Sequence, residues 1–251
     1  MSGRSGTEAM PTLALLAGGR ATRLYPLTET MPKSLVPVAG EPFLAHQLRW
    51  MAAQGVKDVV ICCGHLGGPI REFAGDGERF GLRVQYSEDG DFALGTGGAI
   101  RHALPMLGEK FLVMYGDSWL TASLQDLWAA FCGQQCAGMM TVFRNENRWD
   151  ASNVEIRDGR VARYEKGLHH AGLTHIDYGL SAFRAKAFAG IPDGRVFDLG
   201  FVFQELIVGG GLACHEVRER FYEIGSFEGL SETERLLRQV EQGLEPAGVH
   251  A

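Results

Sequence analysis

Short apolar runs alternate with longer amphipathic segments along the first half of the chain. Residues 12–16, 59–64 and 111–115 are almost wholly apolar, as is typical of parallel strands buried on both faces. Residues 42–53 and 97–107 instead carry apolar side chains at helical spacing, and residues 124–131 do the same. Strands that alternate with helices predict a parallel sheet with right-handed crossovers.

The second half is richer in strand-like segments. The candidates are residues 139–144, 153–157, 160–165 and 176–183. Asp158-Gly159 predicts a tight hairpin turn between the middle two, so this half should add antiparallel strands. Residues 230–240 carry apolar side chains at helical spacing with Glu and Arg between them, which predicts a surface helix.

These patterns predict an α/β fold with a Rossmann-like mixed, mostly parallel sheet, flanked by helices and extended by a small antiparallel lobe. No internal repeat and no long linker divides the chain, so we expect a single domain. The expected boundaries are a disordered segment at 1–10, one domain at 11–245, its halves at 11–135 and 136–228, and a C-terminal helix at 229–245.

Composition narrows the function classes. The 251 residues are 45% hydrophobic and 22% charged, which argues against a disordered chain. No apolar stretch approaches the roughly 18 residues of a membrane span, and the first ten residues lack the apolar core of a secretory signal. The net charge is −6 without a basic run, so neither nucleic acid nor a membrane is an expected partner. We expect a cytoplasmic protein.

Candidate chemistry gathers at the ends of the predicted strands, where parallel sheets bind ligands. Gly18-Gly19 follows the first strand, and Arg23 and Lys33 lie in the proline-rich loop behind it. Glycines let backbone N–H groups approach phosphate oxygens, and the two basic side chains add positive charge. Two glycines by themselves are equally typical of a tight turn without a ligand.

The longer pattern is more specific. Gly-Gly-x-x-Thr-Arg-Leu-x-Pro-Leu-Thr begins at Gly18, and Pro-Lys-x-Leu-x-Pro-Val-x-Gly-x-Pro begins at Pro32. Together they resemble the motif of the sugar-1-phosphate nucleotidyltransferases, and the resemblance extends through nearly the whole chain after the first ten or so residues. The glycines match neither a Walker A loop nor the Rossmann Gly-x-Gly-x-x-Gly fingerprint.

The resemblance implies a nucleotide-binding first half and a sugar-binding second half. Its nucleotide-binding positions are Leu16, Ala17, Gly18, Gly19, Arg23, Gly64, Gly95, Thr96 and Gly97. For the segment around Thr96 there is an alternative interpretation, in which that side chain simply caps a helix.

The resemblance also implies a magnesium site and a sugar-phosphate site. Asp117 and Glu223 would hold Mg²⁺, although relatives commonly have aspartate where this chain has Glu223. The implied sugar-phosphate-binding positions are Asp117, Glu165, Lys166, Asp177 and Gly179. Asp177 could equally be a turn or surface residue. The implied catalytic residues are Arg23, Lys33 and Asp117.

The implied reaction transfers a nucleoside monophosphate from an NTP to a sugar 1-phosphate. The likeness is closest to the D-glycero-D-manno-heptose 1-phosphate guanylyltransferase type, which favours GTP with a heptose or another hexose-like sugar. Alternatives are a UTP-dependent N-acetylmuramate 1-phosphate uridylyltransferase, a non-catalytic regulatory subunit that binds a nucleotide sugar, and a cytidylyltransferase for a non-sugar phosphate. The resemblance also suggests a homodimer.

Overall fold

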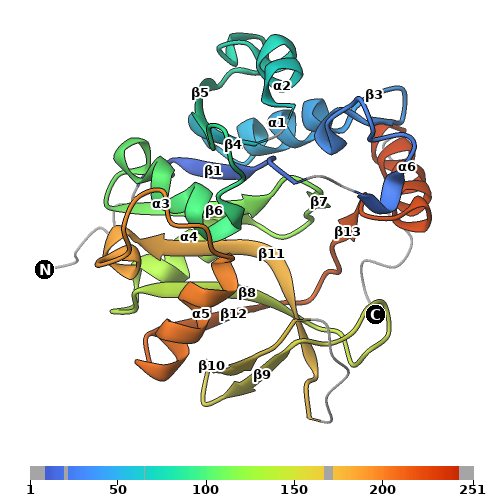
Figure 1. Ribbon diagram of the computed structural model, residues 1–251. Coiled ribbons are helices and arrows are strands. Elements are labelled where there is room, and N and C mark those ends of the chain that lie inside the picture. The colour runs from blue at the N-terminus through green and yellow to red at the C-terminus, as the bar shows by residue number, and fades with distance from the viewer. Residues whose placement is uncertain (1–8, 20–21, 65, 167–171, 243–251) are drawn as a thin grey trace, which may run out of the picture.

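One nine-stranded sheet organises the molecule, in the order β5-β4-β1-β6-β11-β8-β12-β10-β9 (Figure 1). The computed structural model describes residues 9–19, 22–64, 66–166 and 172–242. The strands of this sheet are β1 (Leu13–Leu16), β4 (Asp58–Cys63), β5 (Arg83–Glu88), β6 (Lys110–Tyr115), β8 (Gly138–Arg144), β9 (Val154–Arg157), β10 (Arg160–Tyr164), β11 (His175–Arg184) and β12 (Leu212–Val217).

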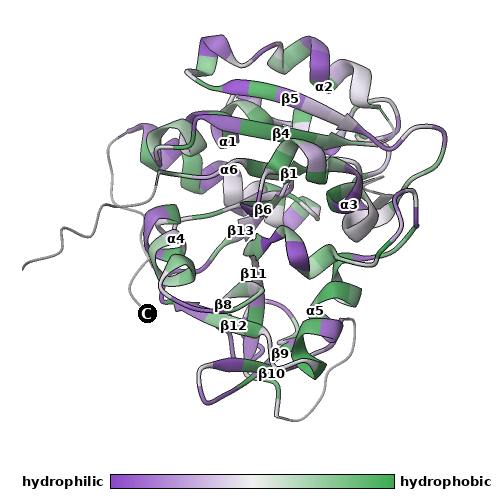
Figure 2. Cartoon of the chain, turned by 90° about the vertical axis from the view of Figure 1, so that its left-hand side faces the viewer, coloured by the Kyte–Doolittle hydropathy of each residue, from purple (hydrophilic) through white to green (hydrophobic). Residues whose placement is uncertain are grey.

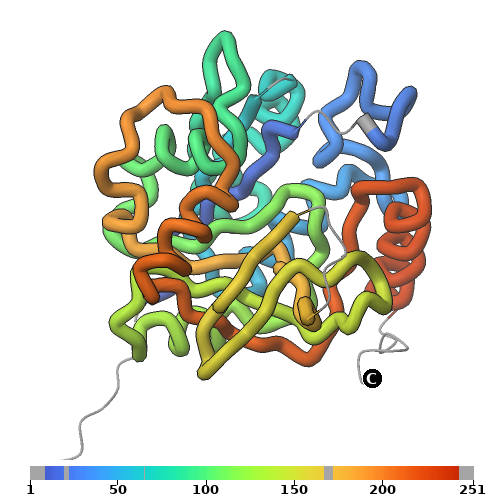
Figure 3. The backbone as a smooth tube through the Cα atoms, turned by 60° about the horizontal axis from the view of Figure 1, so that its bottom comes forward, coloured from blue at the N-terminus to red at the C-terminus, as the bar shows by residue number. Residues whose placement is uncertain are grey.

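The sheet is parallel at one end and mixed at the other. Strands β5, β4, β1 and β6 run parallel, β11 is antiparallel to β6 and β8, and β12 pairs parallel to β8. The predicted α/β class is confirmed, and the antiparallel part is continuous with the main sheet. The β9–β10 hairpin crosses the front of Figure 3; its turn residues Asp158 (φ 50°) and Gly159 (φ 69°) both have the positive φ of a type I′ turn.

Helices cover both faces of the sheet. Figure 2 shows α4 and α6 on one side, and α3 and α5 on the other. The helices are α1 (Phe43–Ala53), α2 (Gly67–Ala74), α3 (Gly95–Leu107), α4 (Leu124–Cys132), α5 (Leu199–Val208) and α6 (Phe227–Glu241), with 3₁₀ turns η1 (Thr22–Leu24), η2 (Lys33–Leu35), η3 (Glu78–Phe80) and η4 (Ala185–Phe188). Within the described part of the chain, none of these helices has the length and apolar character to cross a bilayer.

Alternation along β1 divides the core into two layers. Leu13 and Leu15 pack into the layer that includes α1, α2 and α4, whereas Ala14 faces the layer of α3 and α5. All three side chains are fully buried. The continuous apolar run predicted from the sequence is therefore the consequence of a strand covered on both faces.

A third apolar cluster positions the residues after β6. It consists of Val38, Phe43, Trp119, Ile224, Leu236 and Leu237. These side chains hold two short ribbons, β2 (Pro37–Val38) with β3 (Glu41–Pro42), and β7 (Ser118–Trp119) with β13 (Tyr222–Glu223), against α1 and α6. The cluster thereby brings the C-terminal part of the chain beside the end of β6.

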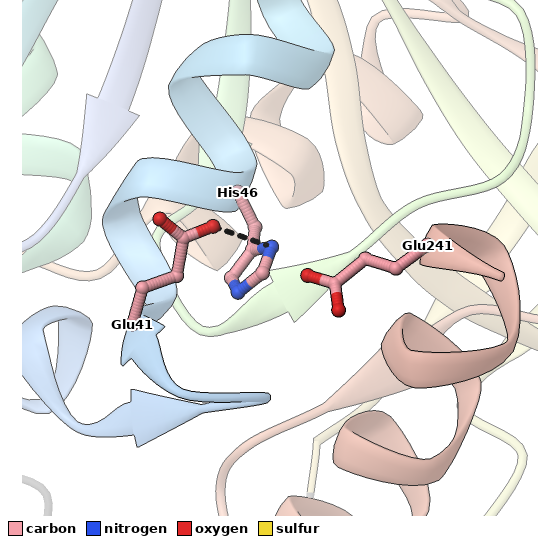
Figure 4. A group of neighbouring side chains, drawn as sticks. All are labelled: Glu41, His46 and Glu241. Carbon is pink, nitrogen blue, oxygen red and sulfur yellow. Dashed lines mark ion pairs between the residues drawn. The ribbon is translucent and has the colours of Figure 1, made fainter.

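Charged side chains of β3 and α1 lie close to the end of α6. Figure 4 shows Glu41, His46 and Glu241 facing one another. His46 Nδ1 lies 3.4 Å from Glu41 Oε1, and its Nε2 lies 2.9 Å from the Val38 carbonyl oxygen. Arg49 binds both carboxylate oxygens of Glu41 and is also attracted by Glu241. The ligand atoms of Glu41, His46 and Glu241 all lie within 4.8 Å of one another, and Arg49 already pairs with Glu41.

Candidate active site

A cavity of about 330 Å³ lies at the carboxyl ends of the parallel strands, and we call it the main cavity. Eight of the residues predicted to bind or react with substrates line it: Leu16, Ala17, Gly18, Gly19, Lys33, Gly95, Thr96 and Asp117. Tyr115 and Gly116, at the end of β6, complete the wall next to Asp117.

The first glycine loop needs glycine because two backbones approach closely. A Cβ on Gly18 would lie 2.9 Å from the backbone nitrogen of Gly64, and a Cβ on Gly64 would lie 2.9 Å from the Gly18 carbonyl oxygen. The backbone of Gly64 therefore packs directly against the first glycine loop. Gly19 has open space where its Cβ would stand, so its backbone is accessible from the main cavity.

The second glycine loop packs against the segment around Phe197. Gly95 has φ +75°, and a Cβ there would lie 2.6 Å from the Phe197 carbonyl oxygen. A Cβ on Gly97 would lie 2.3 Å from the Phe197 ring. The amides of Gly97 and Gly98 both donate to the Phe197 carbonyl oxygen, at 3.0 and 3.2 Å. Gly97 is thus where α3 packs directly on the Phe197 segment, whereas Gly95 lines the main cavity.

Thr96 does not cap its own helix, because the N-cap position of α3 belongs to Leu94. The Thr96 hydroxyl donates to Asp198 Oδ2 at 2.9 Å and accepts from the Leu199 amide at 2.8 Å. The capping interpretation of the sequence is therefore wrong for α3. Thr96 instead joins the start of α3 to the start of α5.

Lys33 and Asp117 meet on the wall of the main cavity. Lys33 lies at the start of η2, and its ammonium is 2.7 Å from Asp117 Oδ2. The lysine side chain is 14% exposed and the aspartate side chain 34%, so the pair is partly shielded from water. The structure thus brings together two of the three predicted catalytic residues.

Glu223 lies beside Asp117 because β13 pairs with β7. In this ribbon Glu223 is opposite Ser118, and the Ile224 amide donates to the Asp117 carbonyl oxygen at 2.9 Å. Burial raises the pKa of Glu223, and the negative charge of Asp117 raises it further. Lys33 and Arg23 act in the opposite direction.

The third predicted catalytic residue, Arg23, lies in η1 with an exposed side chain. It does not line the main cavity. Its positive charge nevertheless acts to lower the pKa of Glu223. Arg23 is therefore near enough to Glu223 for its charge to act on that carboxylate.

Lys166, predicted to bind the sugar phosphate, forms an ion pair with Asp198. The Lys166 ammonium lies 2.8 Å from Asp198 Oδ1, which also accepts from the Gly200 amide at the start of α5. Burial tends to raise the pKa of Asp198, but the hydrogen bond from Lys166 and that from the Gly200 amide outweigh it, and the net shift is downward. The neighbouring Glu165 carboxylate pairs with Arg163 at 3.0 Å.

Asp177 is fixed inside a bulge of β11. Its Oδ1 accepts from the Gly179 amide at 3.0 Å, and its Oδ2 accepts from the Tyr164 hydroxyl at 3.3 Å. Gly179 has φ +81°, and a Cβ there would lie 3.0 Å from the Ser118 hydroxyl oxygen. Burial raises the pKa of Asp177. The alternative that Asp177 is a turn or surface residue is wrong, because it lies within a strand and its carboxylate is held by two neighbours.

Three polar residues of the site were not predicted from the sequence. Asp198 precedes an apolar run, which is the pattern of a helix N-cap and could have indicated α5. Asp89 follows β5 and lines the main cavity; burial raises its pKa, and a hydrogen bond from the Leu94 amide opposes that effect. The Tyr115 hydroxyl is buried and has no hydrogen-bond partner among the residues that the structure describes.

Asp117 and Glu223 are the carboxylates predicted to hold a divalent cation, and the pairing of β13 with β7 brings their segments together. Their negative charges repel each other, and the charge of Asp117 therefore raises the pKa of Glu223. Carboxylate oxygens are the ligands that Mg²⁺ prefers, and a cation between them would remove this repulsion. The residues present therefore fit a magnesium site.

A comparison of the sequence with known families matches residues 14–153 to the model described as nucleotidyl transferase. The chain belongs to this family. An N-acetylmuramate alpha-1-phosphate uridylyltransferase from Neisseria meningitidis is 41% identical over 200 residues, which cover 76% of this chain and 82% of that protein. A D-glycero-alpha-D-manno-heptose 1-phosphate guanylyltransferase from Campylobacter jejuni is 32% identical over 159 residues, which cover 63% of this chain and 70% of that protein.

The fold of this nucleotidyl transferase also matches solved structures. A Bacillus anthracis structure, described as a candidate glucose-1-phosphate thymidylyltransferase, superposes with a TM-score of 0.81 over 92% of this chain and 96% of that chain. Only 22% of the aligned residues are identical, so this likeness concerns the fold. This chain spans 58% of the length of another relative, the UTP–glucose-1-phosphate uridylyltransferase of Synechocystis, with which it shares 25% identity over 225 residues, or 82% of this chain.

The region matched by the family model contains the main cavity residues up to Asp117. It ends before Glu165, Lys166, Asp177 and Glu223. These four predicted site residues therefore lie outside the region that the family model matches.

Proposed function

We propose that this nucleotidyl transferase transfers a nucleoside monophosphate from an NTP to a sugar 1-phosphate and releases pyrophosphate. The observation that carries the proposal is the ion pair of Lys33 and Asp117 on the wall of a glycine-lined cavity, with Glu223 on the strand that pairs beside Asp117. A cation beside two carboxylates suits the handling of phosphate charge through a divalent metal ion.

In the proposed reaction, a phosphate oxygen of the sugar 1-phosphate attacks the α-phosphorus of the NTP. A new oxygen–phosphorus bond forms, and the bond from the α-phosphorus to the bridging oxygen breaks, so pyrophosphate leaves with the electron pair. The attacking oxygen is already anionic, so no side chain has to remove a proton. The task of the protein is to position two polyanions and to neutralise charge.

Each basic residue would bind a different part of the two substrates. Lys33, on the wall of the main cavity, would bind the α-phosphate region, and Arg23, near Glu223, would bind the triphosphate. Lys166 would leave Asp198 and bind the phosphate of the acceptor. Asp117 and Glu223 would hold Mg²⁺, which when bound supplies positive charge to the phosphate oxygens.

For substrates, we propose GTP with a heptose or another hexose-like sugar 1-phosphate. The heptose guanylyltransferase of Campylobacter jejuni supports this pair, at 32% identity. The second candidate is UTP with N-acetylmuramate 1-phosphate, and the longer and more similar alignment with the Neisseria meningitidis protein favours it. A homodimer and a cytoplasmic location remain predictions from the sequence.

Two other classes fit the site less well. A regulatory subunit without activity would not need Arg23, Lys33 and Asp117, and all three are present. A cytidylyltransferase for a non-sugar phosphate would not need Glu165 and Lys166. Both observations support catalysis on a sugar phosphate.

The deciding experiment measures pyrophosphate release with Mg²⁺. Each of GTP, UTP, CTP, ATP and dTTP is offered with a panel of sugar 1-phosphates, in parallel for the native protein and Asp117→Ala. We expect turnover of one nucleotide and sugar pair, abolished in the variant. If no pair turns over while a nucleotide sugar still raises the melting temperature, the regulatory class replaces the enzyme.

A further inference from the structure

Three side chains that can bind a metal ion meet where the end of α6 approaches β3 and α1. They are Glu41, His46 and Glu241, and their ligand atoms, one from each side chain, all lie within 4.8 Å of one another. Within the described part of the chain, no other three ligand atoms of His, Cys, Asp or Glu lie so close together. None of these three residues lines the main cavity. Figure 4 shows the imidazole of His46 between the two carboxylates.

The hydrogen bond between His46 and Val38 decides which ring nitrogen faces the carboxylates. Nε2 of His46 lies 2.9 Å from the Val38 carbonyl oxygen, and that oxygen can only accept, so Nε2 carries the hydrogen. In the neutral imidazole the other nitrogen, Nδ1, then holds a lone pair. Nδ1 lies 3.4 Å from Glu41 Oε1, so a nitrogen lone pair faces a carboxylate oxygen. The imidazole is 6% exposed and packs at right angles to the Trp119 ring, which keeps it in this orientation.

The electron pairs gathered at this point favour a bound cation. Arg49 hydrogen-bonds both oxygens of Glu41, and Glu241 adds a second carboxylate. Two carboxylates and one guanidinium leave one net negative charge beside Nδ1 of His46. Each carboxylate oxygen has two lone pairs, so Glu41 can hold Arg49 and still bind a metal ion. Because the Glu241 side chain is exposed, an ion can enter from the solvent.

We infer that His46 Nδ1 and one carboxylate oxygen each of Glu41 and Glu241 bind a zinc ion. Zinc accepts imidazole and carboxylate ligands in tetrahedral geometry, and a water molecule would be the fourth ligand. A histidine that binds a metal typically donates its other N–H to a carboxylate or a backbone carbonyl, as His46 does to Val38. Mg²⁺ prefers an all-oxygen, octahedral environment, so it does not suit an imidazole nitrogen here.

The bound ion would fasten the end of α6 to β3 and α1. Leu236 and Leu237 of α6 pack into the cluster around Trp119, and β13, which carries Glu223, lies just before α6 in the chain. Zinc would therefore stabilise the segment that brings Glu223 beside Asp117, without contact to a substrate. This structural role does not depend on nucleotidyl transfer.

Zinc binding can be measured directly on the full chain after removal of metal with EDTA. The protein is titrated with Zn²⁺ slightly above neutral pH, by calorimetry and by thermal unfolding. We expect one zinc ion per chain at this site and a rise in melting temperature of about 5 °C when zinc is present at about 100 times its Kd. An excess of Mg²⁺ should not displace the ion.

Cobalt reports which atoms bind the ion. Co²⁺ in place of zinc should give the visible absorption bands of a tetrahedral site with nitrogen and oxygen ligands. It should lack the near-ultraviolet band of a thiolate ligand, which would indicate binding by the cysteines instead.

Two variants remove one ligand each. Glu241→Gln changes an exposed side chain and should weaken zinc binding at least about 10-fold. His46→Gln can keep an N–H donor for the Val38 carbonyl oxygen but has no nitrogen in the position of Nδ1, so it should abolish the cobalt bands. Glu234→Gln is the matched control, because Glu234 lies in the same helix and pairs with Arg238. It should bind zinc like the native protein.

The inference is overturned if zinc does not bind the metal-free protein or does not raise its melting temperature. It is also overturned if Glu241→Gln binds zinc as tightly as Glu234→Gln does, a comparison that decides the matter even if His46→Gln does not fold. Asp117→Ala separates this site from the magnesium site and should retain the zinc-induced shift. Loss of the shift in Asp117→Ala would place the ion at Asp117 instead.

Discussion

Lys33 and Asp117 form an ion pair of 2.7 Å between two loops that are 84 residues apart in the chain. The pair is partly shielded, so it is worth more than a fully exposed surface pair. It keeps a carboxylate aimed at the main cavity with a cation beside it.

Replacement of Asp117 by asparagine should reduce kcat by about 100- to 1,000-fold, because charge stabilisation in a partly dry cleft is lost. Pyrophosphate release as a function of Mg²⁺ concentration measures the effect. The exposed Asp126 provides the matched control, and Asp126→Asn should retain full activity. Equal activity of the two variants would remove Asp117 from the metal site.

Replacement of Glu223 by glutamine should stabilise the free protein while it weakens metal binding. The folded-state pKa of Glu223 is raised above 4.5, so the folded state binds this proton more tightly than the unfolded chain. The free energy of unfolding therefore falls as the pH rises through that pKa. At about pH 7 the variant should melt about 2 °C higher than the native protein, a gain that vanishes below about pH 4.

With Mg²⁺ present, the native protein should melt at a higher temperature than Glu223→Gln. Binding to the native carboxylates stabilises the folded state, whereas Glu223→Gln should show a smaller metal-induced shift in melting temperature. Glu223→Asp keeps a carboxylate and serves as the control. A shift that is equal in the native protein and Glu223→Gln would show that Glu223 is not a metal ligand.

Removal of the Lys166 ammonium should affect the acceptor rather than the nucleotide. Its pair with Asp198 is about half-exposed and contributes only about 0–1 kcal/mol, so a substrate phosphate can replace Asp198 at small cost. Lys166→Ala should raise KM for the sugar 1-phosphate by about 10- to 100-fold and leave KM for the NTP nearly unchanged. Steady-state kinetics with each substrate varied in turn would measure this split. Lys186→Ala, at an exposed position, is the control.

Alanine at Gly97 should destabilise the fold. Its Cβ would lie 2.3 Å from the Phe197 ring, so α3 and the Phe197 segment must move apart at a cost of about 2 kcal/mol. Chemical denaturation gives the free energy of unfolding directly. Gly68→Ala is the paired control, since that glycine lies in α2 with open space around it. It should be neutral or stabilising by up to about 0.5 kcal/mol.

The sequence alone determined the α/β class and the elements with a clear local pattern. The apolar run of β1, the helical spacing of α1 and the Asp158-Gly159 turn all depend on neighbours in the chain, and each was predicted correctly. Helix α5 was missed because nearly every residue of Leu199–Val208 is apolar, so no polar face reveals a helical period.

The tertiary structure decided which distant residues meet. Strands β7 and β13 have two residues each, too few for any sequence pattern, and they pair only because the Trp119 cluster packs α6 against α1. That packing places Glu223 beside Asp117. Asp89 and Asp198 belong to the site for the same reason: their roles depend on what approaches them across the sheet edge, and contacts between remote segments leave no periodicity along the chain.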